Sequence, residues 1–291
     1  PVIHLLQTLE HPYALAAAFS RDGTRLATAG MNNDLTVWQT ADWSREAHIN
    51  AHDKSINALA LSLDGSILVT GSSDCTAVIR SFPGLEERHR VRDRKKVVSG
   101  LAMSPDTDLF AICSYGGRIA AWDFDGQPAA GFKASRGNLT VVAFWADSTH
   151  ILAGGLGGEL TIWSFPGGEP LGAVPAHDIA LSALKADGAN GQVWTLGYEG
   201  KLKVWDADGW HLVRSAKLSD ERIMGCRLNL ERRCAAVLTA GCIRLLDLDN
   251  WTWLDAIEVD SNVLTCAAWS SDGATLAVGS ADRRLRILAV D

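Results

Sequence analysis

One position recurs seven times along this 291-residue chain at an almost constant spacing. It ends a short strand-like run in each copy, and successive copies lie 42, 42, 41, 42, 41 and 42 residues apart, at Trp38, Arg80, Trp122, Trp163, Trp205, Leu246 and Leu288. We call it the anchor position. A repeat of this length, with short alternating strands inside each copy, is typical of a β-propeller built from four-stranded blades. The sequence therefore predicts an all-β fold of seven four-stranded antiparallel blades.

An acidic turn residue supports the same repeat. It stands 16 residues before the anchor in five copies, as Asp22, Asp64, Asp106, Asp147 and Asp272. Runs of small and apolar residues precede these turns, for example LAAAFSRDG at 15–23. Near-continuous apolarity over a short span indicates a strand that is buried on both faces. Such strands suit the interior of a blade that is covered by its neighbours.

The two ends of the sequence indicate how the last blade is completed. Only three residues follow Leu288, which leaves no room for a fourth strand there. Residues 2–9, VIHLLQTL, precede the first repeat and resemble the outer strands of the others. We expect them to pair with the last blade, which would close the ring and remove an open sheet edge. A single seven-bladed propeller would then account for residues 1–291.

Several motifs resemble the WD-repeat β-propeller family. The Trp-Asp dipeptide stands at 122–123 and 205–206, the Gly-Ser-x-Asp turn at 71–74 and 279–282, and the family histidine at His11, His52 and His177. In that family a buried network links the His, a Ser or Thr, the turn Asp and the Trp of one blade. The resemblance assigns to this structural network His52, Ser72 and Asp74 in the second repeat, His177 and Trp205 with Glu199 in the fifth, and Ser280 and Asp282 in the seventh.

The sequence carries no catalytic motif, so we expect neither enzymatic activity nor a bound cofactor or metal. The glycine run GGLGG at 154–158 is followed by the strand-like ELTIW, whereas a phosphate-binding loop must open a helix. One alternative is a small ligand or metal at the axial mouth of the propeller, where Asp74, Glu199 and Asp282 would supply carboxylates, with or without catalysis. A third hypothesis is a sensor or docking domain of a larger multidomain protein.

Cysteine usage and hydropathy bear on the compartment. The six cysteines show no CxxC pair, which favours small buried hydrophobes in a reducing environment, with one disulfide among Cys226, Cys234 and Cys242 as the leading exception. No apolar run reaches the roughly 18–20 residues of a membrane span, and no signal segment is visible at the N-terminus. We therefore expect a cytoplasmic protein that is monomeric by itself.

Large apolar residues occupy one equivalent turn position, seven residues before the anchor, as Met31, Tyr115, Leu156 and Tyr198. This turn joins the second and third strands of a blade and would lie on the upper rim of the propeller. Exposed aromatic and large apolar side chains are typical of partner-binding hot spots. The alternative is that these side chains fold down between blades and fill the upper edge.

The segment RHRVRDRKK at 88–96 concentrates six Arg or Lys residues in a chain of net charge −7. Strand alternation would place Arg88, Arg90, Arg92 and Arg94 on one face of an outer strand, with Lys95 and Lys96 in the following loop. These charges either protect a sheet edge from aggregation or form a docking patch for an acidic or phosphorylated peptide. A pI of 5.6 disfavours nucleic acid. The sequence thus predicts a protein–protein interaction scaffold that uses the rim and this basic segment.

Overall fold

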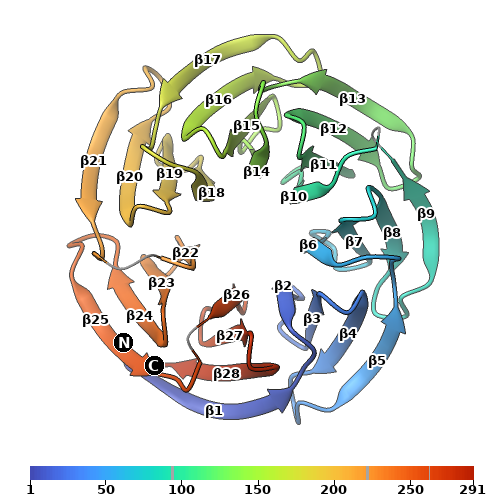
Figure 1. Cartoon of the computed structure of the whole chain (residues 1–291), viewed down its shortest axis with the longest axis vertical. Helices are drawn as coiled ribbons and strands as arrows, with labels where there is room; N and C mark the ends of the chain where they lie inside the picture. The colour runs from blue at the N-terminus through green and yellow to red at the C-terminus, as the bar shows by residue number, and fades with distance from the viewer. Residues whose placement is uncertain (93–94, 221–222, 262) are drawn as a thin grey trace. The chain divides into compact units, whose positions relative to one another are not determined.

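The computed structural model describes residues 1–92, 95–220, 223–261 and 263–291, and every regular element within them is a strand. The strands form seven four-stranded sheets, which we call blades 1 to 7 (Figure 1). The predicted fold class, an all-β seven-bladed β-propeller with antiparallel blades, is therefore confirmed. By its internal contacts the chain divides into two compact units, Pro1–Leu68 with Phe82–Leu85 and Glu221–Asp291, and Val69–Ser81 with Glu86–Asp220.

Three blades belong to the first unit. Blade 1 contains β2 (Ala14–Phe19), β3 (Arg25–Gly30), β4 (Asp34–Gln39) and β5 (Arg45–Asn50). Blade 6 contains β22 (Gly225–Asn229), β23 (Cys234–Thr239), β24 (Cys242–Asp247) and β25 (Trp253–Glu258). Blade 7 contains β26 (Leu264–Trp269), β27 (Thr275–Ser280), β28 (Arg284–Val290) and β1 (Ile3–Glu10).

The second unit holds three more blades. Blade 3 contains β10 (Val98–Met103), β11 (Leu109–Ser114), β12 (Arg118–Asp123) and β13 (Pro128–Lys133). Blade 4 contains β14 (Leu139–Phe144), β15 (His150–Gly155), β16 (Glu159–Ser164) and β17 (Pro170–Pro175). Blade 5 contains β18 (Leu181–Asp187), β19 (Gln192–Gly197), β20 (Lys201–Asp206) and β21 (Leu212–Lys217). The strands of blade 2 are β6 (Ile56–Leu61), β7 (Ile67–Ser72), β8 (Ala77–Ser81) and β9 (Glu87–Val91).

Inner and outer strands of a blade differ in burial as their sequences predict. All six residues of β7, ILVTGS, are buried, because small and apolar side chains fill both faces of a strand in the middle of the blade. The outer strand β13 instead alternates exposed and half-buried residues, and its half-buried Ala130 and Phe132 pack against the cluster between blades 3 and 4. The period of the apolar pattern therefore reports the place of each strand within its blade.

The N-terminal strand completes the last blade, as the sequence predicts. β1 pairs antiparallel with β28, with Ile3 opposite Val290 and Leu9 opposite Leu285, and the blue β1 runs along the red β28 in Figure 1. Val2 and Asp291 exchange two backbone hydrogen bonds of 3.1 and 3.0 Å. The strand spans Ile3–Glu10, one residue later than expected at each end.

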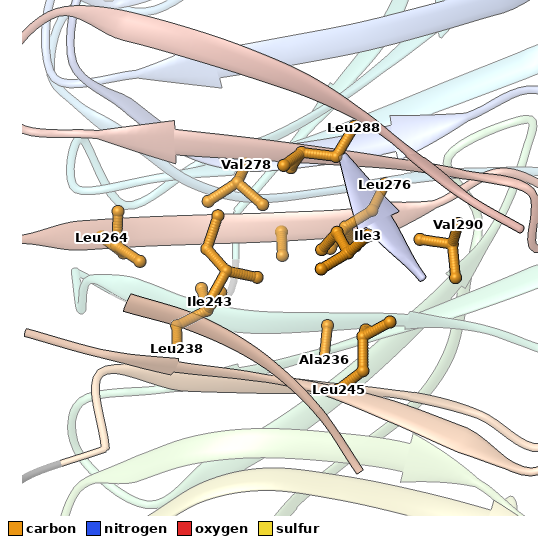
Figure 2. Close-up of a cluster of buried hydrophobic side chains, with 11 residues drawn as sticks. Ile3, Ala236, Leu238, Ile243, Leu245, Leu264, Leu276, Val278, Leu288 and Val290 are labelled. Carbon is orange, nitrogen blue, oxygen red and sulfur yellow. The ribbon is translucent and has the colours of Figure 1, made fainter. Parts of the chain in front are cut away.

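Buried aliphatic side chains hold neighbouring blades of a unit together. Figure 2 shows the cluster in the first unit, where Leu238 and Ile243 of blade 6 face Leu276 and Val278 of blade 7, and Ile3 of β1 joins them. Each of these residues is at most 5 % exposed. Burying a side chain of this size contributes about 1.5–3 kcal/mol. A comparable cluster in the second unit joins blades 3 and 4.

All six cysteines are free in the structure, so the disulfide considered among Cys226, Cys234 and Cys242 is not formed. Burial raises the pKa of the Cys113 and Cys226 thiols to about 12. Both thiols are therefore protonated and unreactive near neutral pH. The described residues also contain no helix that is long and apolar enough to cross a membrane.

Candidate functional site

Blade 5 contains a connected set of buried polar side chains. The indole N–H of Trp205 donates to the hydroxyl of Thr195 at 2.9 Å, and the same hydroxyl lies 2.9 Å from Nε2 of His177. On the other side of the imidazole, Nδ1 lies 2.5 Å from Oε1 of Glu199. Because Thr195 accepts from Trp205, its own proton is available to Nε2. This pattern assigns the His177 proton to Nδ1, from which it is donated to Glu199.

The electrostatics of blade 5 favour this neutral form of the imidazole. Burial lowers the pKa of His177 below its ordinary value, although the hydrogen bond and charge of Glu199 act in the opposite direction. The hydroxyl that joins the set belongs to Thr195, ten residues before the anchor Trp205, a position outside the predicted network. Thr28 and Thr70 stand at the same position in blades 1 and 2. This recurrence of threonine is the sequence signal that could have identified Thr195.

Blade 1 repeats the set without its carboxylate. Trp38 donates to Thr28 at 2.9 Å, and Thr28 lies 2.7 Å from Nε2 of His11. Asn32 stands where blade 5 has Glu199, and its side chain is exposed. Among the described residues Nδ1 of His11 has no hydrogen-bond partner. Burial lowers the pKa of His11 to about 4, which the nearby backbone of Pro12 offsets only in part.

Blade 7 satisfies its turn carboxylate with a different side chain. Arg286 lies on β28, two residues before the anchor, and is only 4 % exposed. Its guanidinium donates to Oγ of Ser280 and to Oδ2 of Asp282, each at 2.6 Å, and Ser280 also donates to Asp282. Burial by itself would raise the pKa of Asp282, but the hydrogen bonds from Arg286 and Ser280 outweigh it and hold the pKa below its ordinary value. The sequence did not single out Arg286, because an arginine in an alternating strand is normally exposed.

The carboxylates considered for an axial metal site are each engaged within their own blade. Asp74 accepts from the backbone N–H and the hydroxyl of Thr76 at 2.8 and 2.6 Å, and its own N–H donates to Ser72 at 3.0 Å. Glu199 and Asp282 are held by His177 and Arg286. His52 is buried, at 4 % exposure. Within the described ranges no group of three or more His, Cys, Asp or Glu side chains is placed to hold a metal ion.

The rim position seven residues before the anchor is largely open to solvent. Met31 and Leu156 are each 52 % exposed, and Tyr115 is 42 % exposed. Tyr198 is half-buried. Three of the four side chains therefore do not fold down to fill the upper edge.

The basic segment is shorter and less regular as a strand than its sequence indicates. β9 ends at Val91, so Arg92 follows the strand, and Arg94 lies outside the described residues. A register shift opposite Ile79 and Arg80 leaves Arg88 as an extra residue in β9, which interrupts the expected alternation. Arg90 is bound to Glu87 at 2.8 Å and lies 3.8 Å from Asp74. A single face of four arginines is therefore not observed.

A cationic pocket lies on blade 3, where the end of the basic segment meets the rim. It encloses about 560 Å³ and is lined by Lys95, Lys96, Arg118 and Lys133 together with Ser114 and Gly116. None of the lining residues in the described part of the chain is an Asp or Glu. The stem of Lys96 lies over Gly116, next to the exposed Tyr115, and Lys133 donates to the Gly116 carbonyl. The structure thus joins Lys95, Lys96 and Tyr115 and adds two cations from β12 and β13.

Backbone hydrogen bonds fix the three segments that form this cationic pocket. The N–H of Tyr115 donates to the carbonyl of Val97 at 2.9 Å, which ties the turn after β11 to the lysine loop. The N–H of Ala134 donates to the carbonyl of Gly117 at 2.8 Å, which ties the same turn to the end of β13. Gly117 has a φ of +73°, and a Cβ there would lie 2.0 Å from the carbonyl oxygen of Ser135. Only glycine fits this junction.

Comparison with known proteins agrees with the fold. The family profile described as "WD domain, G-beta repeat" matches residues 4–39, 43–81, 87–123 and 257–287. Together with the seven blades and the His–Thr–Trp sets of blades 1 and 5, these matches define a WD-repeat propeller. The chain belongs to the WD-repeat family. Proteins of this family generally act as scaffolds for protein interactions and are generally not catalytic.

Individual relatives are distant and considerably longer. The chain is 27 % identical over 189 residues to Telomerase protein component 1 of Mus musculus, and 27 % over 214 residues to Telomerase Cajal body protein 1 of Homo sapiens. It is 28 % identical over 174 residues to WD repeat-containing protein 1 of Bos taurus. The alignments cover 63, 68 and 55 % of this chain but only 7, 39 and 28 % of those relatives. The chain therefore matches a minor part of each relative.

Proposed function

We propose that this protein is a non-catalytic interaction platform that binds an acidic segment of a protein partner at the cationic pocket of blade 3. The observation that carries the proposal is the convergence of the four cationic side chains of Lys95, Lys96, Arg118 and Lys133 on one pocket. The chain as a whole has a net charge of −7, so this concentration of positive charge is local. A local positive patch selects acidic partners and accelerates their association.

Tyr115 adds an exposed aromatic side chain to the same surface. Its side chain is 42 % exposed beside Gly116 in the turn that also borders the pocket. Aromatic side chains next to charged groups carry much of the binding energy in protein interfaces. The turn is already fixed by backbone hydrogen bonds, so binding orders little of this surface and loses little free energy in doing so.

The remaining predicted partner-binding residues stay part of the proposal, each on its own blade. Met31 and Leu156 are exposed apolar rim residues, and Tyr198 contributes a half-buried ring. Arg88 and Arg92 are exposed and contribute long-range attraction, whereas Arg90 is engaged by Glu87. The proposed partner-binding set thus comprises Met31, Tyr115, Leu156, Tyr198, Arg88, Arg90, Arg92, Arg94, Lys95 and Lys96, to which the pocket adds Arg118 and Lys133.

Charge reversal on the two exposed lysines tests the function. The variant Lys95→Glu with Lys96→Glu is compared with Arg21→Glu with Arg45→Glu, two exposed arginines of blade 1 outside the proposed binding set, which changes the net charge equally. We expect affinity capture and mass spectrometry to identify a protein retained by the wild type and the arginine variant but lost from the lysine variant. A synthetic peptide of its acidic segment should then bind the wild type about tenfold more tightly than the lysine variant, a difference of about 1.4 kcal/mol.

Two outcomes of this experiment would contradict the proposal. One is full retention of the partners by the lysine variant, and the other is their equal loss from the arginine variant. Either result would place binding elsewhere. All four substituted side chains are exposed, so the variants should fold normally, which circular dichroism would verify.

We also propose that the platform works in the cytoplasm as a monomer. Six free cysteines are compatible with a reducing compartment. The name of one relative refers to the Cajal body, which makes the nucleus the natural competing location. Imaging of the endogenously tagged protein decides between the two, and a nuclear signal would overturn the cytoplasmic assignment.

A further inference from the structure

His11 of blade 1 is a buried histidine, at 2 % exposure. Its Nε2 lies 2.7 Å from the hydroxyl of Thr28, which accepts the indole N–H of Trp38 at 2.9 Å. The hydroxyl proton is therefore available to Nε2, and this pattern assigns the proton of the neutral ring to Nδ1. Among the described residues that nitrogen has no hydrogen-bond partner. A buried N–H without an acceptor costs free energy, which an entering acceptor would recover.

Blade 5 shows which chemical group fits this position. There Oε1 of Glu199 lies 2.5 Å from Nδ1 of His177, and Glu199 belongs to the turn between β19 and β20. The corresponding residue of blade 1 is Asn32, six residues before the anchor, and its side chain is exposed. The two blades thus share the imidazole, the hydroxyl and the indole, and they differ in the acceptor at Nδ1.

A pocket of about 560 Å³ lies at this place, between the loop before β2 and the turn from β27 to β28. Its lining residues all belong to the first unit and are Glu10, His11, Pro12, Asn32, Asp282, Arg283 and Arg284. In the described part of the chain, no lining residue is shared with the cationic pocket of blade 3. The N–H of His11 donates to the carbonyl of Arg283 at 2.9 Å, which fixes the loop against the turn.

Basic residues accompany both carboxylates in the lining of this pocket. Asp282 is bound by Arg286 at 2.6 Å. Glu10 stands directly opposite Arg284 in the pairing of β1 with β28, and opposite charges in such a pair attract. Arg283 is exposed and adds a further positive charge. These basic groups offset the repulsion that an incoming carboxylate would otherwise meet.

We propose that this pocket binds an acidic side chain of a protein partner, whose carboxylate takes the place in blade 1 that Glu199 has in blade 5 and accepts the Nδ1 proton of His11. The inference goes beyond the proposed function, because it assigns a second contact with a partner on other residues. A carboxylate forms a stronger hydrogen bond with this N–H than a neutral carbonyl does. Glu199 is itself a protein side chain, which makes a side-chain carboxylate the natural occupant.

Binding includes a local rearrangement of the lining. Nδ1 of His11 is closed to solvent, so an entering side chain must open the pocket wall to reach it. Asn32 is the exposed lining residue at the position that the carboxylate takes, and we expect its side chain to turn aside. Changes of side-chain rotamer are common when partners bind.

NMR of the imidazole tests this contact directly. The Nδ1 and Nε2 chemical shifts of His11 in ¹⁵N-labelled protein near neutral pH give the tautomer, and we expect the proton on Nδ1. The spectrum of His11→Gln assigns these signals. Titration with N-acetyl-glutamate amide should move the Nδ1–H signal downfield, as a charge-assisted hydrogen bond forms. N-acetyl-glutamine amide should bind about tenfold more weakly, because its acceptor is neutral.

The variant Asn32→Glu supplies the carboxylate from the turn itself. We expect it to move the Nδ1–H signal of His11 without any ligand. It should also weaken the binding of N-acetyl-glutamate amide about tenfold, because its own side chain occupies the pocket. Met31→Glu is the matched control, since it places the same charge on the exposed neighbouring residue outside the lining. It should leave both the signal and the binding unchanged.

Several results would overturn the proposal. A proton on Nε2 would mean that Nδ1 offers no donor to a carboxylate. Equal binding of the glutamine and glutamate derivatives would remove the preference for acidic side chains, and tighter binding of acetate would point to a small free carboxylate as the ligand. A loss of binding in Met31→Glu equal to that in Asn32→Glu would attribute the effect to surface charge, and a His11 signal that responds to no probe would exclude the contact. Capture with the Lys95 and Lys96 variant decides separately on the proposed function.

Discussion

Blades 5 and 7 solve the same local problem with different chemistry. Each has a carboxylate six residues before its anchor, Glu199 in one and Asp282 in the other. In blade 5 this carboxylate is met by the neutral imidazole of His177, which enters from the loop before the first strand. In blade 7 it is met by the guanidinium of Arg286, which comes from the third strand of the same sheet.

The difference indicates what the blade architecture requires. A partly buried turn carboxylate needs a donor, but the fold fixes neither the chemical type of that donor nor the strand that supplies it. The histidine solution adds a neutral donor and recruits Thr195 and Trp205 into one chain of hydrogen bonds. The arginine solution places a largely buried ion pair between the turn carboxylate and the strand that follows the turn. Three predictions test how far the two solutions are equivalent.

The largest effect is expected in blade 7 from Arg286→Met, which keeps the length of the side chain and removes its charge. Asp282 would lose its charged partner while it remains largely covered, at 22 % side-chain exposure. Loss of one member of a buried pair costs about 3 kcal/mol or more. Urea unfolding of the variant measures this loss. In the double variant with Asp282→Asn most of the stability should return, and a double variant as unstable as the single one would show that the ion pair is not the cause.

A smaller effect is expected on the stability of the protein in acid. In blade 1 Asn32 stands where blade 5 has Glu199, so His11 lacks the turn carboxylate that His177 has. The pKa of His11 is about 4 in the folded protein and 6.5 as its ordinary value. Between these values the unfolded chain binds a proton that the folded chain does not, so the free energy of unfolding decreases as the pH falls. From pH 7.5 to pH 5 this one group should account for a loss of about 2 kcal/mol.

The variant His11→Gln isolates that contribution. Other groups titrate in the same range, so the informative quantity is the difference between the variant and the wild type at the two pH values. Urea unfolding should show a pH dependence that is weaker by about 2 kcal/mol in the variant. Equal pH dependence of the two proteins would show that His11 is protonated as readily in the folded state as in the unfolded one.

The smallest effect is expected from Glu199→Gln in blade 5. The amide oxygen can still accept the proton of His177 Nδ1, so the variant replaces a charge-assisted hydrogen bond by a neutral one, at a cost of about 1 kcal/mol. Asn32→Ala in blade 1 is the matched control, because Asn32 occupies the same position with an exposed side chain. It should change the free energy of unfolding by less than about 0.5 kcal/mol. A larger effect from Asn32 would mean that blade 1 does use its turn residue.

The fold could be predicted because its signal is repeated. The anchor spacing and the alternation of apolar residues act at every blade, so a substituted anchor such as Arg80 or Leu246 does not hide the pattern. The closure by β1 was also predictable, since the last repeat lacks one strand and the N-terminus offers it. These features depend on period and count, which a sequence displays directly.

The polar contacts depend on geometry that a sequence displays less well. The family pattern predicts the network hydroxyl at Ser72 and Ser280, eight residues before the anchor, whereas blade 5 uses Thr195, ten residues before it. Positions two apart share one face of a strand, so the pattern alone could not choose between them. Arg118 and Lys133 are 15 residues apart in the sequence, and only the pairing of β12 with β13 shows that they are opposite each other. Of the described residues in the basic run at 88–96, only Lys95 and Lys96 line the pocket.

The pairing of β1 with β28 also decides how the protein responds to force. Val2 and Asp291 are hydrogen-bonded to each other at one end of an antiparallel ribbon, and the pairs from Ile3 with Val290 to Glu10 with Arg284 follow in order. Tension applied through these two residues would load the hydrogen bonds one after another, as in a zipper, and not all together, as in shear. Blade 7, whose aliphatic packing against blade 6 is shown in Figure 2, is thus also the blade that a modest pull on residues 2 and 291 would open first.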